Sequence, residues 1–62
     1  ALAARLVEAR VRIGATQKAL AERLGCAWRS VQDYEQGKAV PGGQVLASYG
    51  ELGVDLNWLL NG

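Results

Sequence analysis

Residues 16–37 read TQKALAERLGCAWRSVQDYEQG and contain two short apolar patterns of helical period, separated by a glycine. Thr16 is a good N-cap for a first helix over about 17–24, because its hydroxyl can accept a hydrogen bond from an amide of the first turn. Gly25 ends that helix, since glycine adopts the left-handed conformation at little cost. A second helix is expected over about 28–36. The connection is so short that the two helices must cross at a steep angle.

Three residues meet the steric demands of such a crossing. The closest approach of the two helices requires a small side chain, which Ala21 supplies. Gly25 provides the turn, and Val31 provides a branched apolar side chain that points back toward the first helix. Their spacing is the helix-turn-helix pattern, here over about 17–36. A plain helical hairpin is the alternative that the spacing alone leaves open.

The rest of the chain also predicts helices. A helix over about 2–13 precedes the pair and ends at Gly14, a break at 41–43 leads to a fourth helix that ends at Gly53, and Asp55 can cap a short fifth helix. No segment alternates with the period of a strand, so we predict a single all-α domain of five helices over the whole chain. The apolar residues at helical spacing outside the pair are Leu2, Leu6, Ala9, Ile13, Val45, Leu46, Tyr49, Leu52, Leu56, Trp58, Leu59 and Leu60.

Composition excludes several classes of protein. The chain has 62 residues, a single cysteine and no histidine, so it predicts no internal disulfide, no Cys/His metal site and no cofactor. No acid/base pair or phosphate-binding loop can be assembled, and we therefore expect no enzymatic activity and no small-molecule ligand. No apolar run approaches the ~20 residues of a membrane span. The chain begins at Ala1 and contains no methionine, from which we expect a fragment of a longer protein.

The charge is unevenly distributed along the chain. The formal net charge is +1, but residues 1–38 carry all seven basic residues and four of the six acidic ones, a net charge of +3. Residues 39–62 carry the other two acidic residues, a net charge of −2. A basic end can attract phosphate groups even when the total charge is near zero. Ordinary surface charge is the alternative interpretation.

Beyond these patterns, the chain resembles a known family. "TQKALAERLG", "VQDYEQGKAVP" and "LGVDLNWLLNG" are similar to the DNA-binding domain of temperate-phage repressors of the lambdoid repressor/Cro type, and the likeness covers about residues 5–62. The resemblance implies a compact five-helix, lambda-repressor-like domain whose third helix enters the DNA major groove. It further implies a homodimer, weak for the isolated domain, that binds double-stranded operator DNA as a transcriptional repressor in the cytoplasm of a bacterial host, associated with the nucleoid.

The resemblance also implies roles for individual residues. Base reading is expected on the exposed face of the third helix, where a guanidinium can bond guanine O6 and N7 together and an amide can pair with adenine. An ion pair between the first and third helices and a dimer contact in the C-terminal segment are further implications. Arg5 and Arg12 are expected to be mostly solvated and to add long-range attraction. The expected base-reading residues are Trp28, Arg29, Gln32 and Asp33; those for phosphate are Gln17, Lys18, Ser30 and Lys38; the ion pair is Arg10 with Glu35; and the dimer interface is Leu56, Trp58 and Leu59.

Two departures from the family pattern lie at the start of the third helix. Trp28 stands where the family often has a polar reader such as glutamine, and its indole could pack on a sugar or a thymine methyl group, or fold back over the turn. Ala27 stands where a capping serine is common, and alanine cannot cap. Two other functions remain open at this point: another regulator on the same scaffold, such as an antitoxin or a restriction-modification controller, and a helical protein-interaction module without DNA binding.

Overall fold

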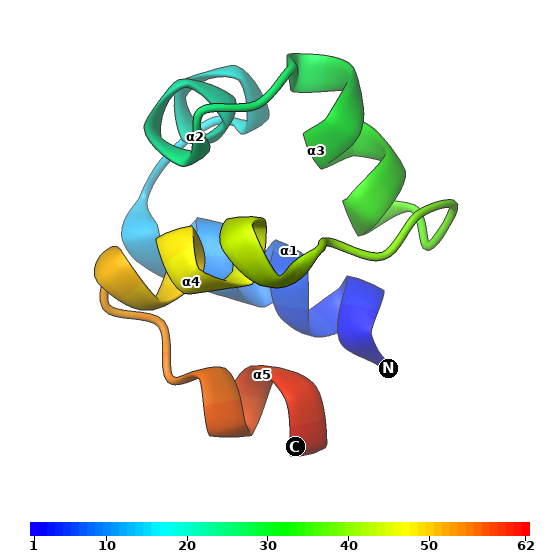
Figure 1. The fold of residues 1–62 in the computed structure, drawn as a ribbon, viewed down its shortest axis with the longest axis vertical. Coiled ribbons are helices and arrows are strands. Elements are labelled where there is room, and N and C mark those ends of the chain that lie inside the picture. The colour runs from blue at the N-terminus through cyan, green and yellow to red at the C-terminus, as the bar shows by residue number, and fades with distance from the viewer.

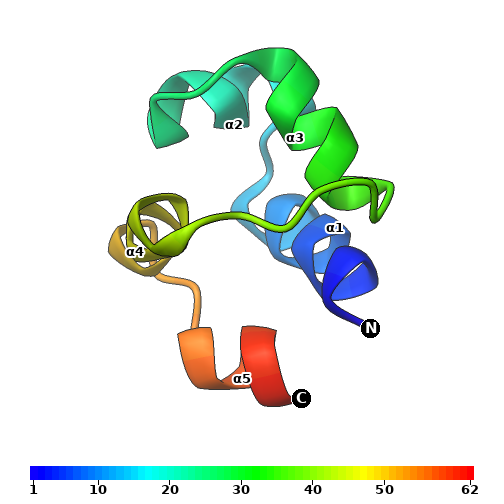
Figure 2. The same cartoon turned by 45° about the vertical axis from the view of Figure 1, so that its right-hand side comes forward.

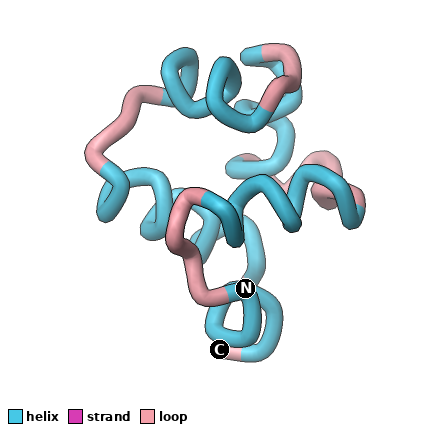
Figure 3. The backbone as a smooth tube through the Cα atoms, turned by 60° about the vertical axis from the view of Figure 1, so that its left-hand side comes forward, coloured by secondary structure: helices cyan, strands magenta, loops and turns pink.

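The computed structural model describes all 62 residues and contains five helices and no strand (Figure 3). This confirms the predicted all-α fold. Its dimensions are 25 × 23 × 21 Å. None of the helices has both the length and the apolar character needed to cross a bilayer. The helices are α1 (Leu2–Ile13), α2 (Gln17–Leu24), α3 (Trp28–Glu35), α4 (Gly43–Glu51) and α5 (Leu56–Asn61).

The ends of the helices follow from local chemistry. Gly14 and Gly25 take left-handed conformations, with φ of 81° and 72°, and end α1 and α2 as expected. Thr16 caps α2, because its Oγ1 accepts a hydrogen bond of 3.1 Å from the amide of Ala19. At the start of α3, Ala27 offers no side-chain cap. The third helix is one residue shorter than the predicted 28–36, since Gln36 is its C-cap.

The helices pack in three tiers (Figures 1 and 2). The pair α2 and α3 forms one end of the molecule, α1 and α4 form the middle, and α5 forms the opposite end. The contacts agree with this order, since α1 touches both α3 and α5, and α4 touches both α2 and α5. The two termini lie near one another on the side of α5 in all views. The tiers therefore place the helix pair as far as possible from the C-terminal helix.

The core lies between these tiers. Ala21 is 3% exposed and Val31 is fully buried, so the two apolar residues of the helix-turn-helix pattern have the burial that their spacing predicted. Cys26 and Tyr34 are partly buried against the same core. Each buried aliphatic side chain stabilises the fold by roughly 1.5–3 kcal/mol relative to leaving it exposed. The buried hydrophobic residues are Leu6, Ala9, Leu20, Ala21, Leu24, Val31, Tyr49 and Leu59.

Candidate nucleic-acid interface

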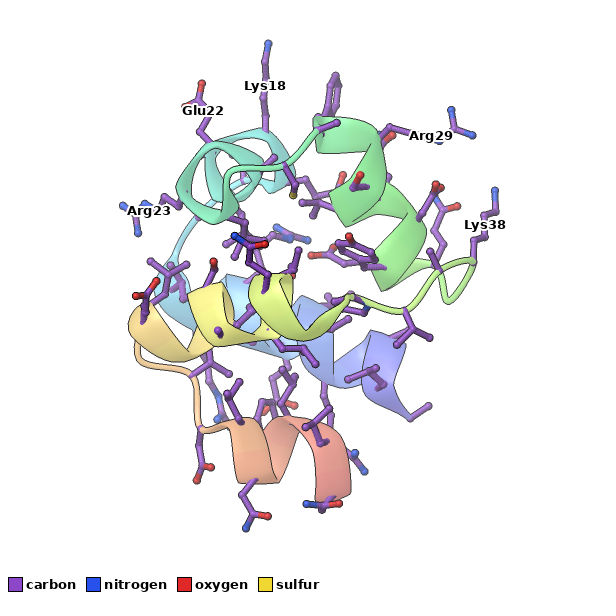
Figure 4. All side chains as sticks on the ribbon, in the orientation of Figure 1. Lys18, Glu22, Arg23, Arg29 and Lys38 are labelled. Atoms are coloured by element: carbon purple, nitrogen blue, oxygen red, sulfur yellow. The ribbon has the colours of Figure 1, made fainter.

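The tight turn between α2 and α3 sets the exposed face of the helix pair. The amide of Cys26 donates a 3.1 Å hydrogen bond to the carbonyl oxygen of Ala21, and this bond closes the end of α2 over the glycine turn. With Val31 buried toward α2, the opposite side of α3 faces solvent. Figure 4 shows Lys18, Arg29 and Lys38 extending away from the helix pair and its following loop. Arg23 and the acidic Glu22 also extend outward from α2 at this end of the molecule.

Arg29 and Asp33 form a pair on the exposed face of α3. Arg29 Nε lies 3.2 Å from Asp33 Oδ1, one helical turn later, and the arginine side chain is 76% exposed. A guanidinium has five N–H donors, so the bond through Nε leaves both terminal nitrogens free. In that arrangement the carboxylate can orient the guanidinium while its own charge is partly neutralised. The pair thus presents a bidentate donor to whatever approaches α3.

Gln17 connects the face to a partly buried ion pair. Its Nε2 donates a 3.0 Å hydrogen bond to Glu35 Oε1, while Arg10 Nε lies 2.8 Å from Glu35 Oε2 and 3.1 Å from Glu35 Oε1. The Glu35 side chain is only 3% exposed, so the ion pair implied by the family resemblance is present and shielded from water. Arg10 Nη1 also donates to the carbonyl oxygen of Ala15 at 3.2 Å. One N–H of the Gln17 amide is left for an outside partner, beside helix-start amides that have no intrahelical acceptor.

Trp28 does not fold back onto the core. It is 49% exposed, and it is not among the partly buried hydrophobic residues that pack against the core. Lys18 Nζ lies 5.7 Å from the centroid of the indole ring, within the range of a cation–π contact. The start of α2 and the start of α3 are thereby joined on the exposed surface. Sequence reasoning missed this contact, because the two residues are neighbours only once the helices have crossed.

The other expected contact residues lie on or beside the same face. Ser30 and Gln32, on α3, are partly exposed, and Lys38 is exposed in the loop that follows the helix. The amide of Lys38 donates a 2.9 Å hydrogen bond to the carbonyl oxygen of Asp33, which fixes the loop against the end of α3. The structure thus brings all eight residues expected to contact bases or phosphates to one end of the molecule.

Arg5 and Arg12 were expected to add long-range attraction for phosphate groups, but both make contacts within the chain. Arg5 Nη1 donates to the carbonyl oxygen of Leu59 at 3.4 Å. Arg12 lies over the ring of Trp58, 5.1 Å from its centroid, and forms an ion pair with Glu8. Both arginines therefore face α5 and lie away from the helix pair. The net charge of residues 1–38 therefore overstated how basic the α2–α3 end is. It includes Arg5 and Arg12, which lie on a face of α1 that points toward α5.

The C-terminal segment divides between core and surface. Leu59 is fully buried within the chain's own core, so its side chain cannot meet a partner, and its expected place in a dimer interface is corrected. Leu56 and Trp58 are partly exposed, and Leu60 is 48% exposed. Trp58 also borders an open cavity of about 520 Å³ between α1, the turn after α4 and the start of α5. The cavity is lined by Ala9, Arg12, Ile13, Leu52, Gly53, Val54, Asp55 and Trp58.

Two side chains near the helix pair, Tyr49 and Cys26, have raised pKa values. Burial raises the pKa of Tyr49 to about 12, with a further upward contribution from the negative charge of Glu35. Its hydroxyl is buried and has no hydrogen-bond partner. Burial also raises the pKa of the Cys26 thiol, which lowers the fraction of nucleophilic thiolate. Both side chains are therefore protonated near neutral pH.

Comparison with known proteins identifies the family of this domain. Residues 1–58 match a family model described as a helix-turn-helix domain. No curated protein and no solved structure matches the chain. The family match covers both helices of the pair, the turn between them and most of the supporting helices. The chain therefore belongs to the helix-turn-helix family of DNA-binding domains.

Proposed function

We propose that this protein is the operator-binding domain of a phage or prophage transcriptional repressor, which binds DNA as a dimer with α3 in the major groove. The observation that carries the proposal is the placement of charge. Lys18, Arg29 and Lys38 extend outward from the α2–α3 end, and the two carboxylates of α3 are paired, Asp33 with Arg29 and Glu35 with Arg10. The resemblance of residues 5–62 to lambdoid repressors supports the regulatory role.

The proposed contacts divide into base reading and phosphate binding. Arg29 reads guanine through its free terminal nitrogens, and Gln32 pairs with adenine in the major groove. Asp33 holds Arg29 in position or accepts a hydrogen bond from cytosine N4. Phosphates are bound by the remaining N–H of the Gln17 amide with the start of α2, and by Lys18, Ser30 and Lys38.

The proposed dimer uses the exposed apolar residues of α5. Leu56 and Trp58, joined by the exposed Leu60, offer apolar surface for a contact between copies. To bind one operator, the two copies must be related by a two-fold axis that places their recognition helices on the same side of the dimer, roughly 34 Å or one turn of DNA apart. A near-palindromic operator follows from that symmetry.

Selection of bound sequences from a random DNA pool at about 50 mM salt, followed by footprinting, tests the proposal. We expect a near-palindromic consensus whose half-sites are centred about ten base pairs apart. Absence of binding to any sequence would contradict the proposal. In an amide-shift titration with the selected DNA, the signals of Gln17, Arg29 and Lys38 should move, and unmoved signals would instead indicate a protein-interaction module.

The salt dependence of binding provides a second readout. The slope of log Kobs against log salt concentration should become shallower by about one unit in Lys38→Ala, because each phosphate contact by a lysine releases about one counterion. Arg23→Ala is the matched control, since Arg23 extends from α2 away from Arg29 and Lys38 (Figure 4). It removes the same charge, so an equal change in slope for both variants would show that net charge alone matters.

A further inference from the structure

The exposed indole of Trp28 contacts Lys18 but does not pack against the core. It is the first residue of α3 and remains 49% exposed, although half-buried hydrophobic side chains elsewhere in the chain pack against the core. A tryptophan left in water forgoes the stabilisation that its burial would give. On the exposed face of α3, one residue before Arg29, the indole is available for a contact outside the chain.

Lys18 holds the indole at the front of the helix pair. The ammonium lies 5.7 Å from the ring centroid, and Lys18 itself extends outward from the start of α2 (Figure 4). A cation–π contact of this kind restrains the ring between α2 and α3 without burying it. Because side chains near the N-terminal end of a recognition helix reach base edges, the restrained ring lies where a base edge would approach.

The chemistry of the indole restricts what it can recognise there. An indole has one N–H donor, no acceptor and a large apolar surface. Hydrogen-bonding groups for base edges are already supplied by Arg29, Gln32 and Asp33 on the same helix. The only apolar group that an unmodified base pair presents in the major groove is the C5-methyl group of thymine. 5-Methylcytosine carries a methyl group at the same position.

We propose that Trp28, restrained by Lys18, is a specificity-determining residue that packs on the C5-methyl group of a pyrimidine in each half-site. This inference rests on the proposed function, because it requires α3 to lie in the major groove. It adds that part of the specificity comes from an apolar contact, and that the domain distinguishes methylated from unmethylated pyrimidines at one position. A thymine would satisfy the contact, and so would a 5-methylcytosine.

The experiment replaces each thymine of the selected half-site by uracil, one position at a time. Uracil keeps the O4 acceptor and removes only the methyl group, so any loss of affinity reports the methyl contact alone. We expect one position at which the change weakens binding about fourfold per half-site, the equivalent of one buried methyl or methylene group. At that position, 5-methylcytosine should bind more tightly than cytosine by a similar factor, which shows that the methyl group is recognised on either base.

Variants of the protein separate this contact from the alternatives. In Trp28→Ala, the preference for thymine over uracil should disappear, whereas Trp28→Phe should retain it, because phenylalanine keeps an apolar face and lacks the N–H. Lys18→Met keeps the alkyl stem and removes the ammonium, and it should weaken the preference. Thermal midpoints within a few degrees of the parent protein would show that the variants remain folded, as expected for an exposed site.

Several results would overturn the inference. These are uracil substitutions that leave binding unchanged at every thymine, a preference that persists in Trp28→Ala, and a selected half-site with neither a thymine nor a methylation-sensitive cytosine. A Trp28→Ala variant that binds all sequences more weakly by one common factor would instead place the indole on the sugar-phosphate backbone. All these outcomes presuppose a selected site, so they are distinct from a failure of the proposed function, in which no sequence is selected.

Discussion

Arg10 Nε on α1 lies 2.8 Å from Glu35 Oε2 at the end of α3, and the Glu35 side chain is 3% exposed. Glu35 also accepts a hydrogen bond from the side-chain amide of Gln17 on α2, so its carboxylate connects α1, α2 and α3. The Arg10 guanidinium donates further to the backbone after α1. The orientation of the recognition helix relative to the rest of the domain therefore depends on a buried, fully bonded carboxylate.

Glu35→Ala should destabilise the domain by about 3–5 kcal/mol, because it leaves the largely buried Arg10 guanidinium without a counter-charge. Thermal unfolding followed by circular dichroism measures the effect, and we expect a midpoint lower by at least about 12 °C. Glu8→Ala is the matched control: it breaks the exposed pair with Arg12 and should cost no more than about 1 kcal/mol. An unchanged midpoint in Glu35→Ala would refute the structural role of the pair.

If Glu35→Ala is too unstable to measure, the double variant Arg10→Met/Glu35→Leu separates the stranded charge from the loss of the pair. Replacement of both charges by apolar side chains of similar volume is often neutral, so much of the stability should return. Failure of the double variant to recover would indicate that the hydrogen bond from Gln17 to Glu35 contributes more than the ion pair.

Arg29→Ala should weaken binding to the selected operator by about 1–3 kcal/mol and relax the preference at one base pair, since a bidentate contact to guanine is lost. Titration against the consensus and its single-base variants measures both effects. Asp33→Asn keeps the shape of the side chain but removes its charge, so it should loosen the orientation of Arg29 and raise affinity for unrelated sequences. If Arg29→Ala weakens binding to every sequence equally, Arg29 contacts a phosphate and reads no base.

Ala27→Ser should stabilise the domain by about 0.5–2 kcal/mol, because α3 begins at an extended residue that has no side-chain cap. Chemical denaturation gives the free energy of unfolding directly. Thr16→Ala is the matched control and should lower the free energy of unfolding, since it removes the side-chain cap of α2. A loss in Thr16→Ala without a gain in Ala27→Ser would show that the start of α3 is already satisfied in another way.

The raised pKa of Tyr49 predicts a pH dependence in alkaline solution. In the unfolded chain the phenol ionises near its ordinary pKa of 10.0, whereas the folded domain keeps the proton until about pH 12. The unfolded state therefore binds fewer protons between these values, and the free energy of unfolding should fall as pH rises from 10 toward 12. Tyr49→Phe should lack this part of the decline, so the difference between the two proteins isolates Tyr49.

At neutral pH, Tyr49→Phe should leave stability unchanged or raise it slightly. The hydroxyl is buried without a partner, so its removal breaks no hydrogen bond and relieves a desolvated polar group. A loss of more than about 1 kcal/mol would show that the hydroxyl is bonded in solution. Measurement of both proteins over the same pH series gives this comparison together with the alkaline one.

Local sequence determined the helices and their ends. Thr16, Gly14 and Gly25 act through their own backbone or through a neighbour within three residues, so their effects can be predicted without knowledge of the fold. The burial of Ala21 and Val31 followed from their spacing, because a steep crossing leaves room for few side chains. The pair between Arg10 and Glu35 came from the family resemblance and not from periodicity, since its members are 25 positions apart.

Only the tertiary structure decided which long side chains meet. Lys18 reaches Trp28, Gln17 reaches Glu35, and Arg12 turns toward Trp58, because helix crossing brings together residues that no period relates. It also buried Leu59, which the sequence left among equivalent apolar residues of the last helix. A helical period shows that one face is apolar, but the depth of each residue on that face depends on the neighbouring helices. The sequence thus determined which elements form and which residues lie on the exposed face of the helix pair, and packing determined which of those residues are held by contacts within the chain.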